Sequence, residues 1–305
     1  MTLTIRFGGY QGPQSVHTRA ADVFRAAVTE AAGPDINVDL LANVTESGRA
    51  AADLLTMVAQ DELDICYFSS SYLTTQVPAL SAIDLPFHYA NRNAAYALLD
   101  GPVGALMAED VARQTNYEVL GFWDNGFRHL SNSQRPIRQA DDCHGLRLRT
   151  LDNAFHQDVF RALGFAPMTI DVRDLVPAIK ANEVDAQENP LTNIVNFGIH
   201  ELQPHVTLTS HFFGVALLLC NRERLQAWPA DVSAAIRQAA AKATASQRRF
   251  ASEDDATCLQ RLQDAGITPH TPDAGEMKTF QDRLTGLKQQ QLDTLPERIA
   301  ALLKS

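Results

Sequence analysis

The feature that most restricts the possible fold is a long helix-forming segment in the last third of the chain. From Pro229 to about Ala265 the sequence has no internal glycine or proline, and proline is favoured in the first turn of a helix. At 1.5 Å per residue this segment would extend roughly 54 Å, which is longer than one small domain. We therefore expect a single helix that runs along two domains. The 305 residues suffice for two domains with separate cores.

Strand and helix patterns alternate over most of the remaining chain. This alternation predicts an α/β fold, in which sheets are covered by helices. The expected strands are residues 3–7, 38–42, 63–68, 117–123, 146–150, 184–187, 205–210 and 213–220, and the expected shorter helices are 16–28, 51–58, 154–163, 173–180, 275–290 and 296–304.

A change in the sequence pattern near residue 124 suggests where the chain first passes from one domain to the other. Asp124-Asn125-Gly126 separates two strand-like runs and is typical of a turn. We expect domain I to contain residues 1–124 and about 212–250, and domain II to contain residues 125–211 and about 251–305, with a ligand cleft between them. Several chain segments pass between the two domains without a flexible linker, which predicts domains that close on a ligand by hinge motion.

Composition excludes several classes of function. A net charge of -10 argues against nucleic-acid binding, which depends on Lys and Arg at phosphates, whereas capture of a small anion depends on the local field. The sequence contains no run of 18 apolar residues, the length needed for a helix to span a membrane. The start, Met1–Phe7, alternates like a strand and carries no secretory signal. Either a mature form begins here with an added methionine, or the protein stays in the cytoplasm.

Signatures of catalysis and of cofactor or metal binding are absent from the sequence. It contains no GxSxG or HExxH, and Gly8–Pro13 fits neither common phosphate-binding loop. The cysteines are scattered, so Cys66 and Cys220 are expected as small buried hydrophobes rather than metal ligands. We expect no catalytic residue, no metal and no cofactor.

The strongest candidate binding residues are an arginine and an asparagine among apolar neighbours. The Arg149 guanidinium is a rigid fork of donors that suits a carboxylate, and the Asn189 amide both donates and accepts. The alternative for Arg149 is pairing with a structural acid. Arg128, flanked by aromatics, lines a cleft or lies on the surface. Glu188 either belongs to the binding region or caps the helix that starts at Pro190.

Further candidates lie at the ends of expected strands, where α/β folds commonly expose ligand-binding groups. Tyr10, Ser69 and Tyr72 are either ligand contacts or plain loop residues. Trp123 offers apolar contact. His211 is placed near a pocket, and the alternative is a core histidine whose ring bonds to backbone.

Three motifs resemble the substrate-binding proteins of tripartite ATP-independent periplasmic (TRAP) transporters, the DctP family. They are Asn125–Ser133, Gly145–Arg149 and Val184–Pro190. The resemblance implies a periplasmic-binding-protein-like fold of two α/β domains, hinged by crossing strands and one long helix, that closes on a small carboxylate. It also implies TRAP membrane permease subunits as partners, a periplasmic location after removal of a signal peptide, and no enzymatic activity.

The resemblance also assigns roles to residues. Arg149 matches the family arginine that grips the ligand carboxylate through a two-pronged salt bridge, and Arg128 matches a second arginine at the cleft. Asn189 matches an asparagine that bonds the same carboxylate or an adjacent hydroxyl. Positions where family members vary the pocket lining are Tyr10, Ser69, Tyr72 and His211.

Departures from the family pattern narrow the expected ligand. Val172 stands where members often have an aromatic over the carboxylate end, and Asp174-Leu175-Val176 replaces a common Glu-Val-Tyr. Tyr10, Ser69 and Tyr72 replace the polar or charged groups of sialic-acid binders. We therefore expect a small monocarboxylate or hydroxy acid. The alternatives to a binding protein of a transporter are a ligand-sensing protein for a signalling partner and an enzyme with Glu188 or His211 as general base.

Overall fold

The computed structural model describes residues 3–33 and 35–303, and the chain forms two compact units. Unit 1 contains Met1–Ser70, Ala105–Asp124 and Val215–Glu253. Unit 2 contains Ser71–Gly104, Asn125–Gly214 and Asp254–Ser305. The mixed α/β, two-domain fold predicted from the sequence is confirmed.

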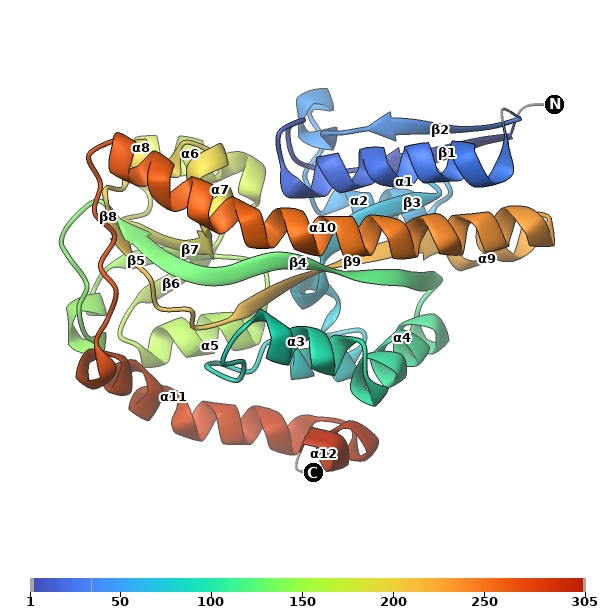
Figure 1. Cartoon of the computed structure of the whole chain (residues 1–305). Coiled ribbons are helices and arrows are strands. Elements are labelled where there is room, and N and C mark those ends of the chain that lie inside the picture. The colour runs from blue at the N-terminus through green and yellow to red at the C-terminus, as the bar shows by residue number, and fades with distance from the viewer. Residues whose placement is uncertain (1–2, 34, 304–305) are drawn as a thin grey trace. The chain divides into compact units, whose positions relative to one another are not determined.

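Several elements have residues in both units. Among them are strands β4 (Tyr117–Asn132) and β9 (Phe213–Asn221) and helix α10 (Ala230–Asp264), each continuous in Figure 1. Helix α10 begins and ends within one residue of the segment predicted from the absence of glycine and proline.

Unit 1 is built around the strand order β2-β1-β3-β9-β4. Strand β1 is parallel to β2 and β3, and β3 is antiparallel to β9. All nine residues of β9 are buried, which explains its apolar sequence, and the strand lies between β3 and β4. Besides β4 and α10, the elements that begin in this unit are β1 (Leu3–Gly8), α1 (Val16–Ala32), β2 (Ile36–Leu41), η1 (Val44–Ser47), α2 (Asp53–Ala59), β3 (Ile65–Ser69), η2 (Ser70–Leu73) and α9 (Arg222–Ala227).

Unit 2 has the strand order β4-β7-β5-β6, with β8 also paired to β4. Its core joins Leu148, Phe160, Phe212 and Phe280, so that α11 covers the same core as α5. The remaining elements are η3 (Pro78–Ala82), α3 (Arg92–Leu99), α4 (Pro102–Gln114), η4 (Ala140–Cys143), β5 (Arg147–Thr150), α5 (Ala154–Ala162), β6 (Ala166–Thr169), α6 (Val172–Lys180), β7 (Ala186–Pro190), α7 (Leu191–Asn196), α8 (Ile199–Leu202), β8 (His205–Thr207), α11 (Ala274–Thr294) and α12 (Glu297–Leu303).

The turn expected at Asp124-Asn125-Gly126 is wrong, because these residues lie inside the continuous strand β4. Gly126 has φ +91°, a conformation that glycine adopts without steric cost. In unit 1 the side chain of Gln247 donates to the Asp124 carbonyl and accepts from the Asp124 N–H, both at 2.7 Å. A helix side chain therefore satisfies backbone groups that the sequence pattern assigned to a turn.

Residues 71–104 group with unit 2, whereas the sequence-based division placed them in domain I. Polar contacts within unit 2 support this grouping. Asp84 lies 3.2 Å from the Nε2 of His156, and Arg92 forms an ion pair with Asp255 at 2.7 Å. Such contacts join positions far apart in the sequence, where no local pattern reports them.

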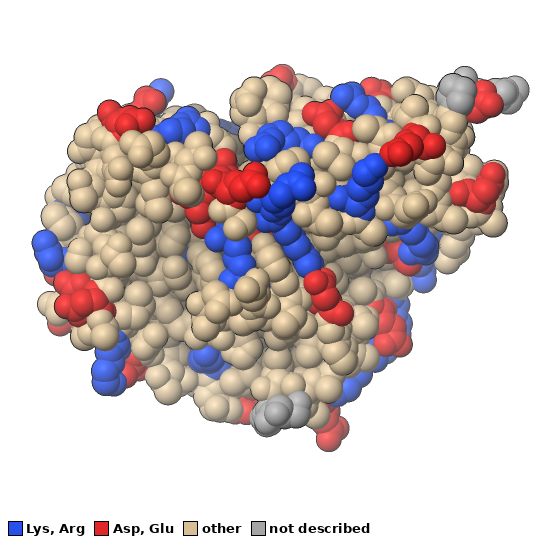
Figure 2. All heavy atoms as spheres, in the orientation of Figure 1, with Lys and Arg blue, Asp and Glu red and all other residues tan. Residues whose placement is uncertain are grey.

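Charges of both signs are interspersed on the surface. On the face in Figure 2, Lys and Arg side chains lie close to Asp and Glu, and exposed ion pairs such as Lys278–Asp282 are frequent. Within the described residues no helix has the length and apolar character needed to cross a bilayer, and no group of three or more His, Cys, Asp or Glu is placed to hold a metal. All four cysteines are buried and free.

Candidate functional site

Arg149 is a buried guanidinium held at one nitrogen. It lies on β5 with 2% of its surface exposed, and its Nε donates to the Ile170 carbonyl at 2.7 Å. Throughout residues 3–33 and 35–303, no carboxylate forms an ion pair with Arg149. The pairing with a structural acid that the sequence left open is therefore not what the structure has. Burial lowers the pKa of Arg149, while Tyr72 and Glu188 act in the opposite direction.

Arg128, in contrast, is neutralised within the protein. Its Nε donates to Oε2 of Glu188, and its Nη2 donates to Oε1 at 2.8 Å and to the Glu188 carbonyl at 2.9 Å. Both side chains are buried, at 4% and 0% exposure. A further contact, from Arg128 Nη2 to Asn189 Oδ1 at 3.4 Å, joins the pair to the neighbouring amide.

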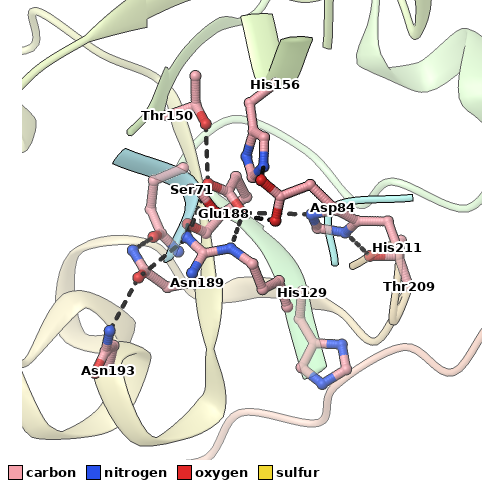
Figure 3. A network of polar contacts seen from close by, with 12 residues as sticks. Ser71, Asp84, His129, Thr150, His156, Glu188, Asn189, Asn193, Thr209 and His211 are labelled. Atoms are coloured by element: carbon pink, nitrogen blue, oxygen red, sulfur yellow. Dashed lines mark hydrogen bonds and ion pairs between the residues drawn. The ribbon is translucent and has the colours of Figure 1, made fainter. Parts of the chain in front are cut away.

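Glu188 contacts polar groups from strands β4 and β5 and from the loop before β9 (Figure 3). Besides Arg128 it accepts from the Thr150 hydroxyl at 3.0 Å, and its Oε2 lies 3.4 Å from His211 Nε2. Burial disfavours its charge, but Arg128 and His211 together outweigh burial and hold the pKa of Glu188 below its usual range. The proposed capping role is wrong, because helix α7 has Pro190 at its N-cap and no side-chain cap bond.

His211 is a fully enclosed histidine bonded at both ring nitrogens. Its Nδ1 lies 2.7 Å from Thr209 Oγ1, and its ring meets Phe160 and Phe212 edge-on. Burial lowers the pKa of His211, although Glu188 opposes this.

Asn189 is oriented by a chain of hydrogen bonds (Figure 3). Asn193 Nδ2 donates to its Oδ1 at 3.1 Å, and its own Nδ2 donates to Gln187 Oε1 at 2.5 Å. The chain continues from Gln187 to the hydroxyl of Ser131 at 2.6 Å. A side-chain amide fixed in this way has few accessible rotamers, which is the condition for preorganised binding.

Unit 2 thus brings most of the predicted residues into one polar neighbourhood. The pKa of Tyr72 is raised by burial, and Arg149 and Arg128 oppose this rise. Val172 begins helix α6, two residues after the carbonyl that accepts from Arg149. The neighbourhood therefore contains Arg149, Arg128, Asn189, Tyr72 and His211, with Val172 at its border.

Three other candidates lie in unit 1. Tyr10 is 7% exposed, its N–H donates to the Tyr67 hydroxyl at 3.3 Å, and its ring contacts Tyr67 and Phe68. Ser69 is the last residue of β3 and is buried. Trp123 has no exposed surface, and its Nε1 donates to Thr244 Oγ1 at 3.1 Å, so it packs as a core residue of this unit.

Thr150 and the pairing of Arg128 with Glu188 were not predicted from the sequence. Thr150 follows Arg149 directly, and its signal was only a polar residue at the end of a buried strand. Glu188 was recognised as a candidate, but its pairing with Arg128 was not. These partners lie on different strands. The sequence pattern does not specify the pairing register between strands, so it could not predict that they meet.

Comparison with known proteins identifies the family. Residues 7–293 match bacterial extracellular solute-binding protein, family 7 (DctP). The 2,3-diketo-L-gulonate-binding periplasmic protein YiaO of Escherichia coli (strain K12) is 24% identical over 281 residues, which cover 92% of this chain and 84% of YiaO.

Solved structures share the fold over their whole length. The sugar acid binding protein DctPAm from Advenella mimigardefordensis, in complex with galactonate, has TM-score 0.94 at 24% identity and covers 99% of this chain and 96% of that chain. A TRAP periplasmic solute binding protein from Sulfurospirillum deleyianum with bound succinate has TM-score 0.93 at 25% identity, covering 100% and 99%. The resemblance seen in three sequence motifs thus extends to nearly the whole chain, which belongs to the DctP family, the solute-binding proteins of TRAP transporters.

Proposed function

We propose that this protein binds a small monocarboxylate or hydroxy acid and that Arg149 grips the carboxylate. The observation that carries this proposal is the buried guanidinium whose Nε alone is bonded among the described residues. A buried cation without a paired carboxylate is costly. A ligand carboxylate that met the two terminal nitrogens of Arg149 in a bidentate pair would remove this cost.

The other predicted residues receive supporting roles in this proposal. Because Arg128 is already paired with Glu188, we assign it to positioning Asn189 rather than to a grip of its own. Asn189 would bond the ligand carboxylate or an adjacent hydroxyl. Contacts that line the remaining site are proposed for Tyr72, Val172 and His211, whereas Trp123 is left out because its indole bonds within the unit 1 core.

The size of the ligand is inferred from Val172 and from the related proteins. An aliphatic side chain at this position offers no aromatic face. The related proteins carry acids from succinate to galactonate and 2,3-diketo-L-gulonate, and all of these ligands are carboxylates. We place the ligand of this chain at the small end of that range of molecular size, as a monocarboxylate or hydroxy acid.

Substitution of Arg149 tests the proposal directly, with Arg147 as the matched control. Arg147 lies on the same strand but is exposed and paired with Asp185 at 2.7 Å. After a thermal-shift screen of small acids has found a ligand, Arg149→Ala should cost about 2–5 kcal/mol of binding, a loss in affinity of about thirtyfold or more. Arg147→Ala should change the affinity by less than about threefold. Calorimetric titration of the Arg149 variant with wild-type affinity would reject the assignment.

We propose a periplasmic location and delivery of the acid to TRAP membrane permease subunits. Glu188 and His211 are the groups that an enzyme would use as base, and each is held by protein partners. This arrangement favours binding without turnover over catalysis. Uptake of labelled acid into vesicles with the permease should require this protein, and NMR of the recovered acid should show it unchanged. A sensing role would be supported instead if uptake proceeded equally without it.

A further inference from the structure

A recess that shares no lining residue with the Arg149 neighbourhood lies within unit 2 beside helix α11. It encloses about 620 Å³. One wall is the segment Pro86-Phe87, and the other is the face of α11 that carries Leu284, Lys288 and Leu292. Leu284 also belongs to the unit 2 core, so this wall is anchored to the folded interior. We call this recess the α11 hollow.

The backbone of Phe87, which forms this wall, is held at both its N–H and its carbonyl. Phe87 adopts φ 51°, a left-handed conformation that is rare for a bulky residue. Its N–H donates to the His211 carbonyl at 3.0 Å, and its own carbonyl accepts from Lys288 Nζ at 3.2 Å. These two hydrogen bonds hold the segment in its unusual conformation, so the hollow has a built wall.

Lys288 differs from the other basic residues of α11. Lys278 is exposed and paired with Asp282, and Arg283 pairs with Asp141. Lys288 is half-buried, and its bond to a carbonyl is its one contact of this kind in the described chain. Burial lowers the pKa of Lys288. A protein with net charge -10 has ample carboxylates, and none of those described pairs with this ammonium.

We propose that the α11 hollow binds a small anion with an apolar tail. The carboxylate or sulfonate head would meet Lys288, where it replaces the hydration that burial removes. The tail would pack on Phe87, Leu284 and Leu292, where each buried methylene contributes about 0.8 kcal/mol. A ligand with only one of these two features would bind more weakly. The α11 hollow shares no binding residue with the Arg149 site, so an experiment can reject either binding proposal without affecting the other.

Octanoate is the probe for the test, with 1-octanol as its uncharged counterpart. Calorimetric titration should show saturable 1:1 binding of octanoate. Lys288→Met should weaken octanoate binding about tenfold or more, equivalent to about 1.4 kcal/mol, without a comparable loss for 1-octanol. Lys278→Met, on the same helix, is the matched control and should leave octanoate affinity unchanged. Arg149→Ala should also retain octanoate binding.

A second variant removes part of the apolar wall without removing the lysine. Leu292 lines the hollow on the same face of α11 as Lys288. Leu292→Ser should therefore weaken octanoate and 1-octanol alike, with an unchanged circular-dichroism spectrum. The proposal is overturned if octanoate does not saturate at millimolar concentrations, or if it binds the wild type, Lys288→Met and Leu292→Ser equally.

Discussion

Three arginines of unit 2 lie in three different environments. Arg147 is exposed and paired, Arg128 is buried and paired, and Arg149 is buried with only its Nε bonded among the described residues. A guanidinium on the surface gains little from its partner, while a buried pair is costly to break. Only the third environment leaves donors for a ligand. Two of the three family motifs contain these arginines, Asn125–Ser133 and Gly145–Arg149, but neither motif states which partner each arginine meets.

Removal of the Glu188 charge tests the buried pair. Glu188→Gln leaves the Arg128 cation without a carboxylate and should lower the free energy of unfolding by about 3–5 kcal/mol. Asp282→Asn removes the exposed partner of Lys278 and should cost less than about 1 kcal/mol. Urea unfolding at neutral pH measures both values. Equal effects of the two substitutions would show that the Arg128 pair contributes no more than a surface contact.

Acid should destabilise the protein partly through His17 of unit 1. Its ring stacks on Tyr67 and its Nδ1 lies 3.1 Å from Gln11 Oε1. Burial lowers the pKa of His17 from 6.5 to about 3. The unfolded state therefore binds the proton first, so this contribution to stability is complete above pH 6.5 and is lost as the pH falls toward 3.

The pH dependence of unfolding measures this contribution. Between these limits the loss is about 1.4 kcal/mol per pH unit for one proton. His17→Phe keeps an aromatic ring but cannot be protonated, so its stability should fall less steeply with acid in urea titrations. An identical slope in wild type and variant would contradict the assignment of His17.

At the scale of elements, helix α10 was predictable and strand β6 was not. Helix α10 has an unbroken helix-forming composition, which is a local property. Strand β6 reads Ala166-Pro167-Met168-Thr169, and proline argues against a strand. The strand forms because β6 stands at the end of the unit 2 strand order, where among the described strands it pairs with β5 alone. Edge position is a tertiary property, and it overrides the local pattern.

Two helical glycines provide a matched test of local packing. A Cβ at Gly104 of α4 would lie 1.8 Å from the Leu99 carbonyl oxygen, a backbone atom, whereas one at Gly286 of α11 meets nothing within 4 Å. Gly286→Ala should raise the free energy of unfolding by about 0.5–1 kcal/mol through helix propensity. Gly104→Ala should lower it, because the backbone must shift. Denaturant unfolding compares the two, and equal signs would contradict this account.

At the scale of the whole molecule, two domains were predictable but their composition in residues was not. The alternating patterns report how many strands and helices exist, which suffices for two cores. They do not report that residues 71–104 contact α5 through Asp84 and His156. Likewise, the sequence placed Trp123 in the site, but its indole bonds within the unit 1 core. Assignments of this kind depend on contacts between distant positions.

Ligand binding should stabilise the molecule as a whole through Arg149. A ligand that binds only the folded state adds RT ln(1 + [L]/Kd), about 2.7 kcal/mol at a hundredfold excess over Kd. Differential scanning fluorimetry should therefore show a rise of several degrees in the unfolding temperature of the wild type and of Arg147→Ala. Arg149→Ala should show no rise at the same concentration, because its Kd has increased beyond that excess. A full shift in Arg149→Ala, with none from 1-octanol, would mean that the acid is held by another cation of this chain.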